Sequence, residues 1–301
     1  MAEMNLTDLS CLREIMARFG ISTKKKYGQN FLINRSVPIR IAEEGCLDEE
    51  DGVLEIGPGM GTLTRALCAR AKKVVCLEID ETLIPVLEYT LADFDNVTVV
   101  LKDVLKTDLA ALCAEYFADC KSIRVCANLP YYITTPVLMY LLESGVNFAS
   151  VTVMVQKEVA DRITASAGSG EYGAITAAVA YYGKAERLFT VSPGSFLPAP
   201  KVESAVMRID MHEQNPYEGC DRRLLFDMVK AAFEQRRKTL NNTLKGLLSP
   251  EERLLMKSVL WEMGFPEDVR GERLDISHYA RLAEAIGNSR AKMKSRVAGD
   301  M

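Results

Sequence analysis

The feature that most constrains the fold is a regular alternation of short apolar runs and helical patterns between residues 53 and 165. Val53–Ile56 reads as a short strand, and Thr62–Ala71 carries apolar residues at helical spacing. Four more such pairs follow, with strands predicted at 74–79, 97–101, 123–127 and 151–155 and helices at 83–91, 108–117, 135–142 and 157–165. Strands that alternate with helices form a parallel sheet covered by helices on both faces.

Further elements complete the sheet and define the domains. A helix is predicted at 174–182, and strands at 187–191 and 204–209 complete a seven-stranded sheet. The polar stretch 212–218, which contains Pro216, separates this sheet from a second region. That region has a purely helical pattern, at 224–235, 240–247, 251–263 and 277–286. We therefore expect an N-terminal helical extension over 1–23, with Thr7 as N-cap, an α/β domain over 24–212 and a small all-helical domain over 213–301. Residues 24–32 are expected to form a loop, and residues 288–301 to be frayed.

Composition narrows the function by exclusion. The eight cysteines include no Cys-x-x-Cys pair, and His212 and His278 are the only histidines, so neither a metal centre nor a Ser-His-Asp site is expected. No membrane span or secretory leader is visible, so the sequence predicts a cytoplasmic protein. The net charge is −4, yet residues 221–301 hold 16 Lys and Arg against 12 Asp and Glu. Such a basic end favours phosphate binding, with an ordinary solvated surface as the alternative.

A glycine-rich turn joins the first predicted strand to its helix. Gly57, Gly59 and Gly61 have the spacing Gly-x-Gly-x-Gly, and glycines at the carboxyl end of a strand let a ligand approach the backbone. A dinucleotide fingerprint would need glycine where this chain has Thr62, which weakens a pyrophosphate-binding interpretation.

Polar side chains follow the next strands. Glu78 suits the ribose hydroxyls of an adenosine-containing cofactor, Asp103 suits its adenine amino group, and Asn128 follows the fourth strand. Each carboxylate alone is explained as well by a helix N-cap or a solvated turn. Because the carboxyl ends of parallel strands meet in one crevice, their joint placement indicates a binding site, and together with the group at Asn128 it points to S-adenosylmethionine.

The group Asn128-Leu129-Pro130-Tyr131 is typical of a site that methylates an exocyclic base nitrogen. Such a nitrogen is a poor nucleophile because its lone pair is delocalised into the ring. The Asn128 side chain and the Leu129 carbonyl, placed by the extended backbone before Pro130, can accept its two N–H bonds. Tyr131 offers a flat face on which an extruded base can stack. A strand end turned by Asn and Pro is the simpler alternative.

These motifs resemble the small-subunit (16S) rRNA adenine N6-dimethyltransferase family, the kasugamycin-sensitivity methyltransferases. The likeness covers about 24–247 and rests on five blocks in order, at 28–32, 55–59, 128–131, 196–206 and 233–240. It implies a Rossmann-like, class I S-adenosylmethionine-dependent methyltransferase fold with a small helical C-terminal domain. It also implies dimethylation of N6 of two adjacent adenosines, in a hairpin loop near the 3′ end of small-subunit rRNA within the pre-30S subunit, by a monomer.

The resemblance also assigns residues by position. It implies that the cofactor is held by Asn30, Leu32, Gly57, Glu78, Asp103 and Asn128. It implies that the target adenine lies between Tyr131 and Phe196, although core packing is an alternative role for Phe196. It further implies rRNA backbone contacts from Arg236, Arg237 and Lys238, with Lys24, Lys25 and Lys26 as a second basic patch. Cations in the last turn of a helix are the alternative for the first patch.

Two other functions compete with this assignment. A sibling family methylates adenosine in large-subunit (23S) rRNA and confers macrolide resistance, and it shares the Asn-x-Pro-Tyr group. The block Gln235-Arg236-Arg237-Lys238-Thr239 argues against that sibling. The second alternative is an RNA-binding assembly factor that does not depend on catalysis.

Overall fold

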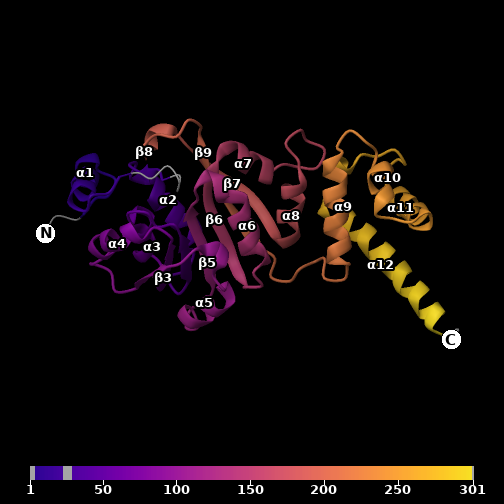
Figure 1. Cartoon of the computed structure of the whole chain (residues 1–301), viewed down its shortest axis with the longest axis horizontal. Coiled ribbons are helices and arrows are strands. Elements are labelled where there is room, and N and C mark those ends of the chain that lie inside the picture. Colours follow the sequence, from indigo (N-terminus) through magenta and orange to yellow (C-terminus); the bar gives the residue numbers. More distant parts are fainter. Residues whose placement is uncertain (1–3, 23–28, 300–301) are drawn as a thin grey trace. The chain divides into compact units, whose positions relative to one another are not determined.

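Within residues 4–22 and 29–299, which the computed structural model describes, seven strands form the central sheet of the first of two compact units (Figure 1). The strand order is β4-β3-β2-β5-β6-β9-β7. Neighbours from β4 to β6 are parallel, and β9 is antiparallel to β6. The predicted mostly parallel sheet is therefore confirmed. Its strands are β2 (Gly52–Ile56), β3 (Lys73–Glu78), β4 (Val97–Leu101), β5 (Ile123–Asn128), β6 (Phe148–Gln156), β7 (Gly183–Val191) and β9 (Ser204–Met211).

One helix directly precedes β2, and other helices connect the strands that follow it, as the alternating pattern predicts. They are α2 (Ser36–Gly45), α3 (Thr62–Cys68), α4 (Ile84–Thr90), α5 (Leu109–Tyr116), α6 (Thr134–Glu143) and α7 (Lys157–Ile163). Local chemistry sets their ends: the Asp108 side chain accepts the Ala111 N–H at 3.0 Å and so fixes the first turn of α5. Ile41 of α2 and Leu63 of α3 are buried in one cluster with Val53 of β2, which attaches these helices to the sheet.

The N-terminal helix α1 (Leu9–Arg18) belongs to the same unit rather than forming a separate extension. Its buried residues Leu12 and Ile15 share an apolar cluster with Val86 and Leu87 of α4. The predicted cap at Thr7 is wrong by one residue. The N-cap is Asp8, whose carboxylate accepts the N–H groups of the first turn, because a carboxylate at this position satisfies two otherwise unpaired donors.

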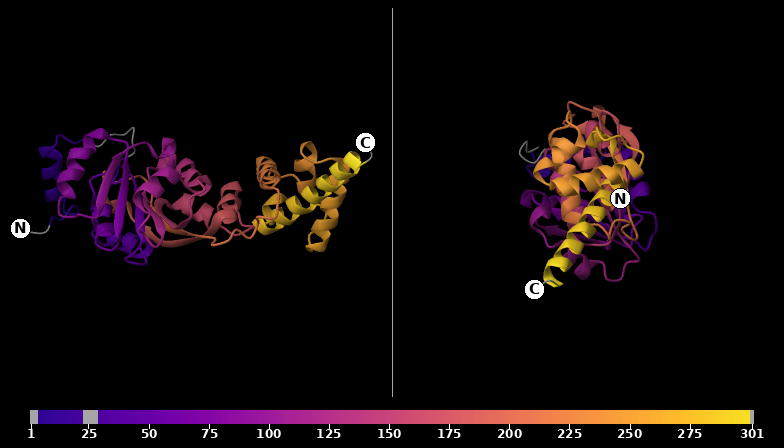
Figure 2. Two further views of the ribbon diagram at one scale, coloured as in Figure 1. Left: turned by 90° about the horizontal axis from the view of Figure 1, so that it is seen from below. Right: turned by 90° about the vertical axis from the view of Figure 1, so that its right-hand side faces the viewer.

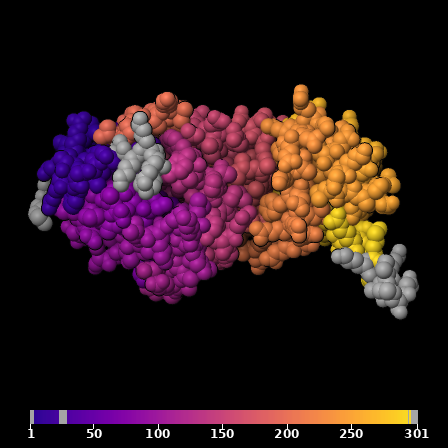
Figure 3. All heavy atoms as spheres, viewed as in Figure 1, coloured from indigo at the N-terminus to yellow at the C-terminus, as the bar shows by residue number. Residues whose placement is uncertain are grey.

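A small second sheet was missed by the sequence reading. Strand β1 (Phe31–Leu32) pairs antiparallel with β8 (Phe196–Leu197), so part of the expected loop at 24–32 is extended and paired. Figure 3 shows the segment around β8 on the surface beside the N-terminal residues. Two-residue strands that meet a partner more than 160 residues away carry no local periodicity, which is why pattern analysis does not find them.

The second unit is built from two stretches of chain, Asp161–Gly183 and His212–Met301. The second stretch begins at His212, beside the predicted boundary at 212/213, and helix α8 (Ala174–Tyr182) belongs to this unit rather than to the unit that contains the sheet. The other helices are α9 (Arg222–Glu234), α10 (Leu240–Thr243), α11 (Pro250–Glu262) and α12 (Ile276–Gly299). Figure 2 shows α12 as one long helix, so the expected fraying from residue 288 is wrong.

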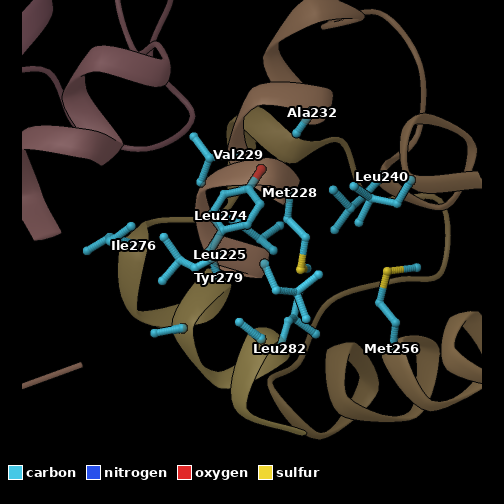
Figure 4. Close-up of a cluster of buried hydrophobic side chains, with 14 of the residues drawn as sticks. Leu225, Met228, Val229, Ala232, Leu240, Met256, Leu274, Ile276, Tyr279 and Leu282 are labelled. Carbon is cyan, nitrogen blue, oxygen red and sulfur yellow. The ribbon is translucent and has the colours of Figure 1, made fainter. Parts of the chain in front are cut away.

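A buried apolar cluster explains why the first stretch joins the second unit. Tyr172, Ala177 and Tyr181 are buried with Leu225 and Met228 of α9 in the core whose central residues Figure 4 shows. The Tyr172 hydroxyl also donates to the Leu274 carbonyl at 3.0 Å. Burying these aromatic rings stabilises the second unit by several kcal/mol. This stretch of chain therefore joins the second unit, although its neighbours in sequence belong to the sheet.

Two other kinds of feature are absent from residues 4–22 and 29–299. No helix there has the length and apolar character needed to cross a membrane. No group of three or more His, Cys, Asp or Glu side chains in that part is arranged to hold a metal ion. All eight cysteines are free thiols.

Candidate active site

A cavity of about 270 Å³ opens at the carboxyl ends of β2, β3 and β5. The register explains its position, because Ile56 lies beside Leu77 on one side and Ala127 on the other, so the three strands end at one edge of the sheet. Every residue predicted to bind the cofactor lines it, together with the predicted base-binding group: Asn30, Leu32, Gly57, Glu78, Asp103, Asn128, Leu129, Pro130 and Tyr131. Sequence reasoning therefore identified residues that the fold brings together.

The glycine turn forms one wall of this cavity. Gly57, Gly59 and Gly61 all have positive φ angles, of 69°, 59° and 87°. This left-handed backbone strains any residue with a Cβ, so the turn requires glycine for its shape. A Cβ on Gly61 would also lie 3.0 Å from the Thr90 hydroxyl, so close packing adds to the requirement there.

Glu78 lies at the end of β3 and is 4% exposed. Its Oε1 accepts the N–H groups of Ile79 and Asp80 at 2.8 and 2.7 Å. Burial raises the pKa of Glu78 above its ordinary value, against the opposing effect of these backbone donors. These bonds, together with one from the Gly59 N–H, order the strand end, and Glu78 lines the cavity.

Asp103 and Asn128 occupy the equivalent ends of β4 and β5. Asp103 Oδ1 accepts the Leu105 N–H at 3.0 Å, so the residue is an N-cap, as the alternative held, and it also lines the cavity. The Asn128 side-chain amide donates to the Asn30 carbonyl at 3.4 Å. This contact joins two residues 98 positions apart and directs the carbonyl end of the Asn128 side chain away from Asn30.

Tyr131 begins the short 3₁₀ turn η4 (Tyr131–Ile133), directly after Pro130. Its hydroxyl shares a hydrogen bond of 2.6 Å with the Ser204 hydroxyl of β9. Burial raises the pKa of Tyr131. The residue also lines the cavity. Leu129 is buried, and its N–H extends the sheet by donating to the Met154 carbonyl at 3.2 Å.

Phe196 does not line the cavity. It is 3% exposed and packs with Leu32, Val206 and other buried residues of the cluster that also contains Met154. The pairing of β8 with β1 holds it there. The structure thus places Phe196 in the environment that the core-packing alternative described.

Glu55 is the site residue to which sequence reasoning gave no role. It is 1% exposed, lines the cavity from β2, and accepts a hydrogen bond from the Cys76 thiol at 3.4 Å. Burial raises its pKa to about 7. One signal could have identified it: it is the single charged residue inside the apolar run Val53–Ile56.

The predicted RNA-binding residues belong to other parts of the chain. Arg236, Arg237 and Lys238 follow the end of α9 in the second unit and are all exposed. Arg236 already pairs with Glu272 at 3.2 Å and donates to the Gly170 carbonyl at 3.2 Å. Lys24, Lys25 and Lys26 lie outside the described residues.

Comparison with known proteins identifies the family. Residues 20–282 match the family described as ribosomal RNA adenine dimethylase. The chain is 44% identical over 285 residues to ribosomal RNA small subunit methyltransferase A of Streptococcus gordonii, which covers 94% of this chain and 98% of the relative. It is also 44% identical over 276 residues to the protein of that name from Bacillus mycoides, covering 91% and 94%.

Solved structures agree with this assignment. A dimethyladenosine transferase from Plasmodium falciparum matches with a TM-score of 0.67 and 25% identity, over 83% of this chain and 95% of its own. The 23S rRNA methyltransferase ErmE matches with a TM-score of 0.68 and 28% identity, over 86% and 100%. With the family matched across most of its length and its curated relatives covered almost end to end, the chain belongs to the ribosomal RNA adenine dimethylase family.

Proposed function

We propose that this protein transfers methyl groups from S-adenosylmethionine to N6 of two adjacent adenosines, in a hairpin loop near the 3′ end of small-subunit rRNA. Its family makes it an rRNA adenine dimethyltransferase, and relatives that share 44% of its residues are named small subunit methyltransferases. The large-subunit alternative is supported by only 28% identity and is not favoured. One observation carries the proposal: the base-binding group and the cofactor residues line the same cavity.

The residues of the cavity fit S-adenosylmethionine. Gly57 and Gly59 leave backbone without side chains along one wall. A Cβ on Gly57 would meet no protein atom within 4 Å, so the space beside it is open to a ligand. The Glu78 carboxylate, which lines the cavity, suits a ribose hydroxyl, and Asp103 suits the adenine amino group. When bound, the donor supplies a methyl group on a positively charged sulfur, which is already an activated leaving group.

Asn128 has the central role in the proposed reaction. Its side-chain amide is tied to the Asn30 carbonyl, so its own carbonyl oxygen is oriented to accept one N–H of the target amine, and the Leu129 carbonyl accepts the other. Both acceptors draw the nitrogen lone pair out of the purine ring and toward the methyl group. The surplus proton on N6 then passes to water, and alignment rather than a strong base supplies the catalysis.

Tyr131 is proposed to stack on the extruded adenine, because its ring lines the cavity two residues beyond Leu129. A stacking role for Phe196 stays a prediction, and it would require this 3% exposed ring to become accessible when substrate binds. We further propose that the protein acts as a monomer in the cytoplasm, with small-subunit rRNA in the pre-30S subunit as its partner.

Labelled donor incubated with unmethylated small subunits tests the proposed function. The label should appear on N6 of two adjacent adenines of the small-subunit rRNA. Unmethylated large-subunit rRNA, run in parallel, should remain unlabelled, and labelling of it would favour the sibling function. Binding of the subunit without any transfer would favour the assembly-factor alternative.

Glu78→Ala is expected to weaken S-adenosylmethionine binding by about 1.5–3 kcal/mol, the scale of hydrogen bonds to a charged group. Isothermal titration calorimetry measures this directly. Because Oε1 also orders the backbone of Ile79 and Asp80, Glu78→Gln should be measured beside it, since an amide oxygen can keep those bonds. The exposed neighbour Glu81 supplies the control: Glu81→Ala should bind the donor normally. Unchanged affinity of Glu78→Ala would refute the ribose assignment.

The double variant Arg237→Ala and Lys238→Ala is expected to weaken rRNA binding and to flatten its salt dependence. The slope of log K against log salt is negative, and each lost phosphate contact reduces its magnitude by roughly 0.7–0.9. Arg236 is left unchanged because it pairs with Glu272. Its substitution would change the stability of the protein as well as its binding of rRNA. Filter binding at several salt concentrations measures the slope, with Arg13→Ala on α1 as an exposed-cation control. A double variant whose slope equals that of the unaltered protein would remove these residues from the RNA surface.

A further inference from the structure

We propose that Ser204 is a positioning residue that fixes the ring of Tyr131 for the target base. The inference rests on the proposed function, since it assigns Ser204 a part in base methylation. Its direct observation is the 2.6 Å hydrogen bond between the two hydroxyls. Ser204 is fully buried, at 0% exposure, whereas Tyr131 is half-buried and lines the cavity.

The sheet places Ser204 rigidly. It is the first residue of β9 and pairs with Gln156 at the end of β6, and the Lys157 N–H donates to the carbonyl of the preceding Glu203 at 3.0 Å. Two residues further along β9, Val206 pairs with Met154, and Met154 pairs in turn with Asn128. The backbone that carries Ser204 is therefore held in one hydrogen-bonded register with the backbone that carries Asn128.

Tyr131, in contrast, lies on a turn just beyond the sheet. The Pro130 carbonyl accepts the Ile133 N–H at 3.1 Å and the Thr134 hydroxyl at 3.3 Å, so local bonds order the backbone of this turn. They leave two side-chain torsions of Tyr131 to be fixed. The bond to Ser204 holds the hydroxyl end of the ring. The stacking face is therefore fixed relative to the same sheet that positions Asn128.

This arrangement gives a role to a sequence block that the cofactor site does not use. The block at 196–206 begins at Phe196, which is buried in β8, and ends in β9. From this block, the Ser204 hydroxyl forms a hydrogen bond with Tyr131 of the base-binding group. A side chain that does not itself line the cavity thereby determines the geometry of one that does.

A double-mutant cycle on methyl transfer tests the proposal. Ser204→Ala, Tyr131→Phe and the double variant are compared at saturating donor on unmethylated small subunits. Each single change should lower kcat by about 3- to 10-fold, the rate equivalent of one lost hydrogen bond. The double variant should be no slower than the slower single variant, because both changes break the same bond. The dissociation constant for S-adenosylmethionine should not change.

Ser150→Ala is the matched control. Ser150 is also at 0% exposure on β6, but it binds Arg124 near the opposite end of that strand, so its loss should lower the melting temperature without lowering kcat. Losses that multiply in the double variant, or a Ser204→Ala enzyme with full activity, would overturn the inference. Those outcomes are distinct from failure of the proposed function, in which the unaltered protein itself would not label small-subunit adenine.

Discussion

Asn128→Ala is expected to lower the rate of methyl transfer by about 10²–10³-fold, the usual cost of removing an oriented polar group that stabilises the transition state. In the proposed reaction the target nitrogen acquires positive charge as it attacks, and the Asn128 carbonyl accepts one of its N–H groups. The substitution also removes the 3.4 Å bond to the Asn30 carbonyl, a small effect on stability for so long a bond.

Single-turnover transfer from labelled donor measures this loss, and co-sedimentation with the immature subunit measures binding. Binding should be retained, because Asn128 lies in the cavity and not among the exposed cations proposed to hold rRNA. Asn96→Ala is a suitable control, since Asn96 donates to the backbone carbonyls of Cys68 and Ala71 and does not line the cavity. If Asn128→Ala no longer associated with the subunit, Asn128 would be structural and its proposed role wrong.

Glu55→Gln is expected to change the pH dependence of stability. The folded-state pKa of Glu55 is about 7, against 4.5 for the exposed group. The folded protein therefore binds a proton at Glu55 more tightly than the unfolded chain does. The resulting contribution to the free energy of unfolding is fully present below pH 4.5 and is lost as pH rises to about 7. The difference corresponds to about 3 kcal/mol. A glutamine has no such proton to lose. Between low pH and about pH 8, the free energy of unfolding of the variant should therefore rise by that amount relative to the unaltered protein.

Urea unfolding of both proteins near pH 4 and near pH 8 measures the change, because the effect appears as a shift in midpoint at constant slope. Glu88→Gln, on the exposed side of α4, should show no such pH-dependent gain. A stability difference between Glu55→Gln and the unaltered protein that stayed constant with pH would mean that the Glu55 carboxylate is ionised at little cost in the folded state.

Local patterns predicted most of the fold. The strand at Val97–Leu101 and the helix at Ala174–Tyr182 have the predicted bounds, because an apolar strand between turns and a helix between glycines are determined by neighbouring residues. The misses depend on distant partners. Strand β1 exists because it meets β8, and α8 joins the second unit because its buried side chains pack on α9. Periodicity reports which residues are apolar, but not what covers them.

The same distinction applies to the site. Gly57, Glu78 and Asn128 were found because parallel strands must end together, so that their position in sequence fixes their position in space. Sequence reasoning offered the burial of Phe196 only as an alternative and did not find the bond between Ser204 and Tyr131, because both depend on how a returning loop packs. The resemblance to a family supplied the chemistry, whereas packing determines which aromatic ring meets the cavity.

The division of the second unit between two stretches of chain has a consequence for engineering. A fragment that begins at residue 212 would lack Tyr172, Ala177 and Tyr181, and the core around Leu225 would be left open. A fragment that ends there would carry these rings with nothing to cover them. Grafting this unit from one relative onto another therefore requires exchange of residues 161–183 together with everything after 211, and chimaeras joined at a single crossover should be poorly soluble.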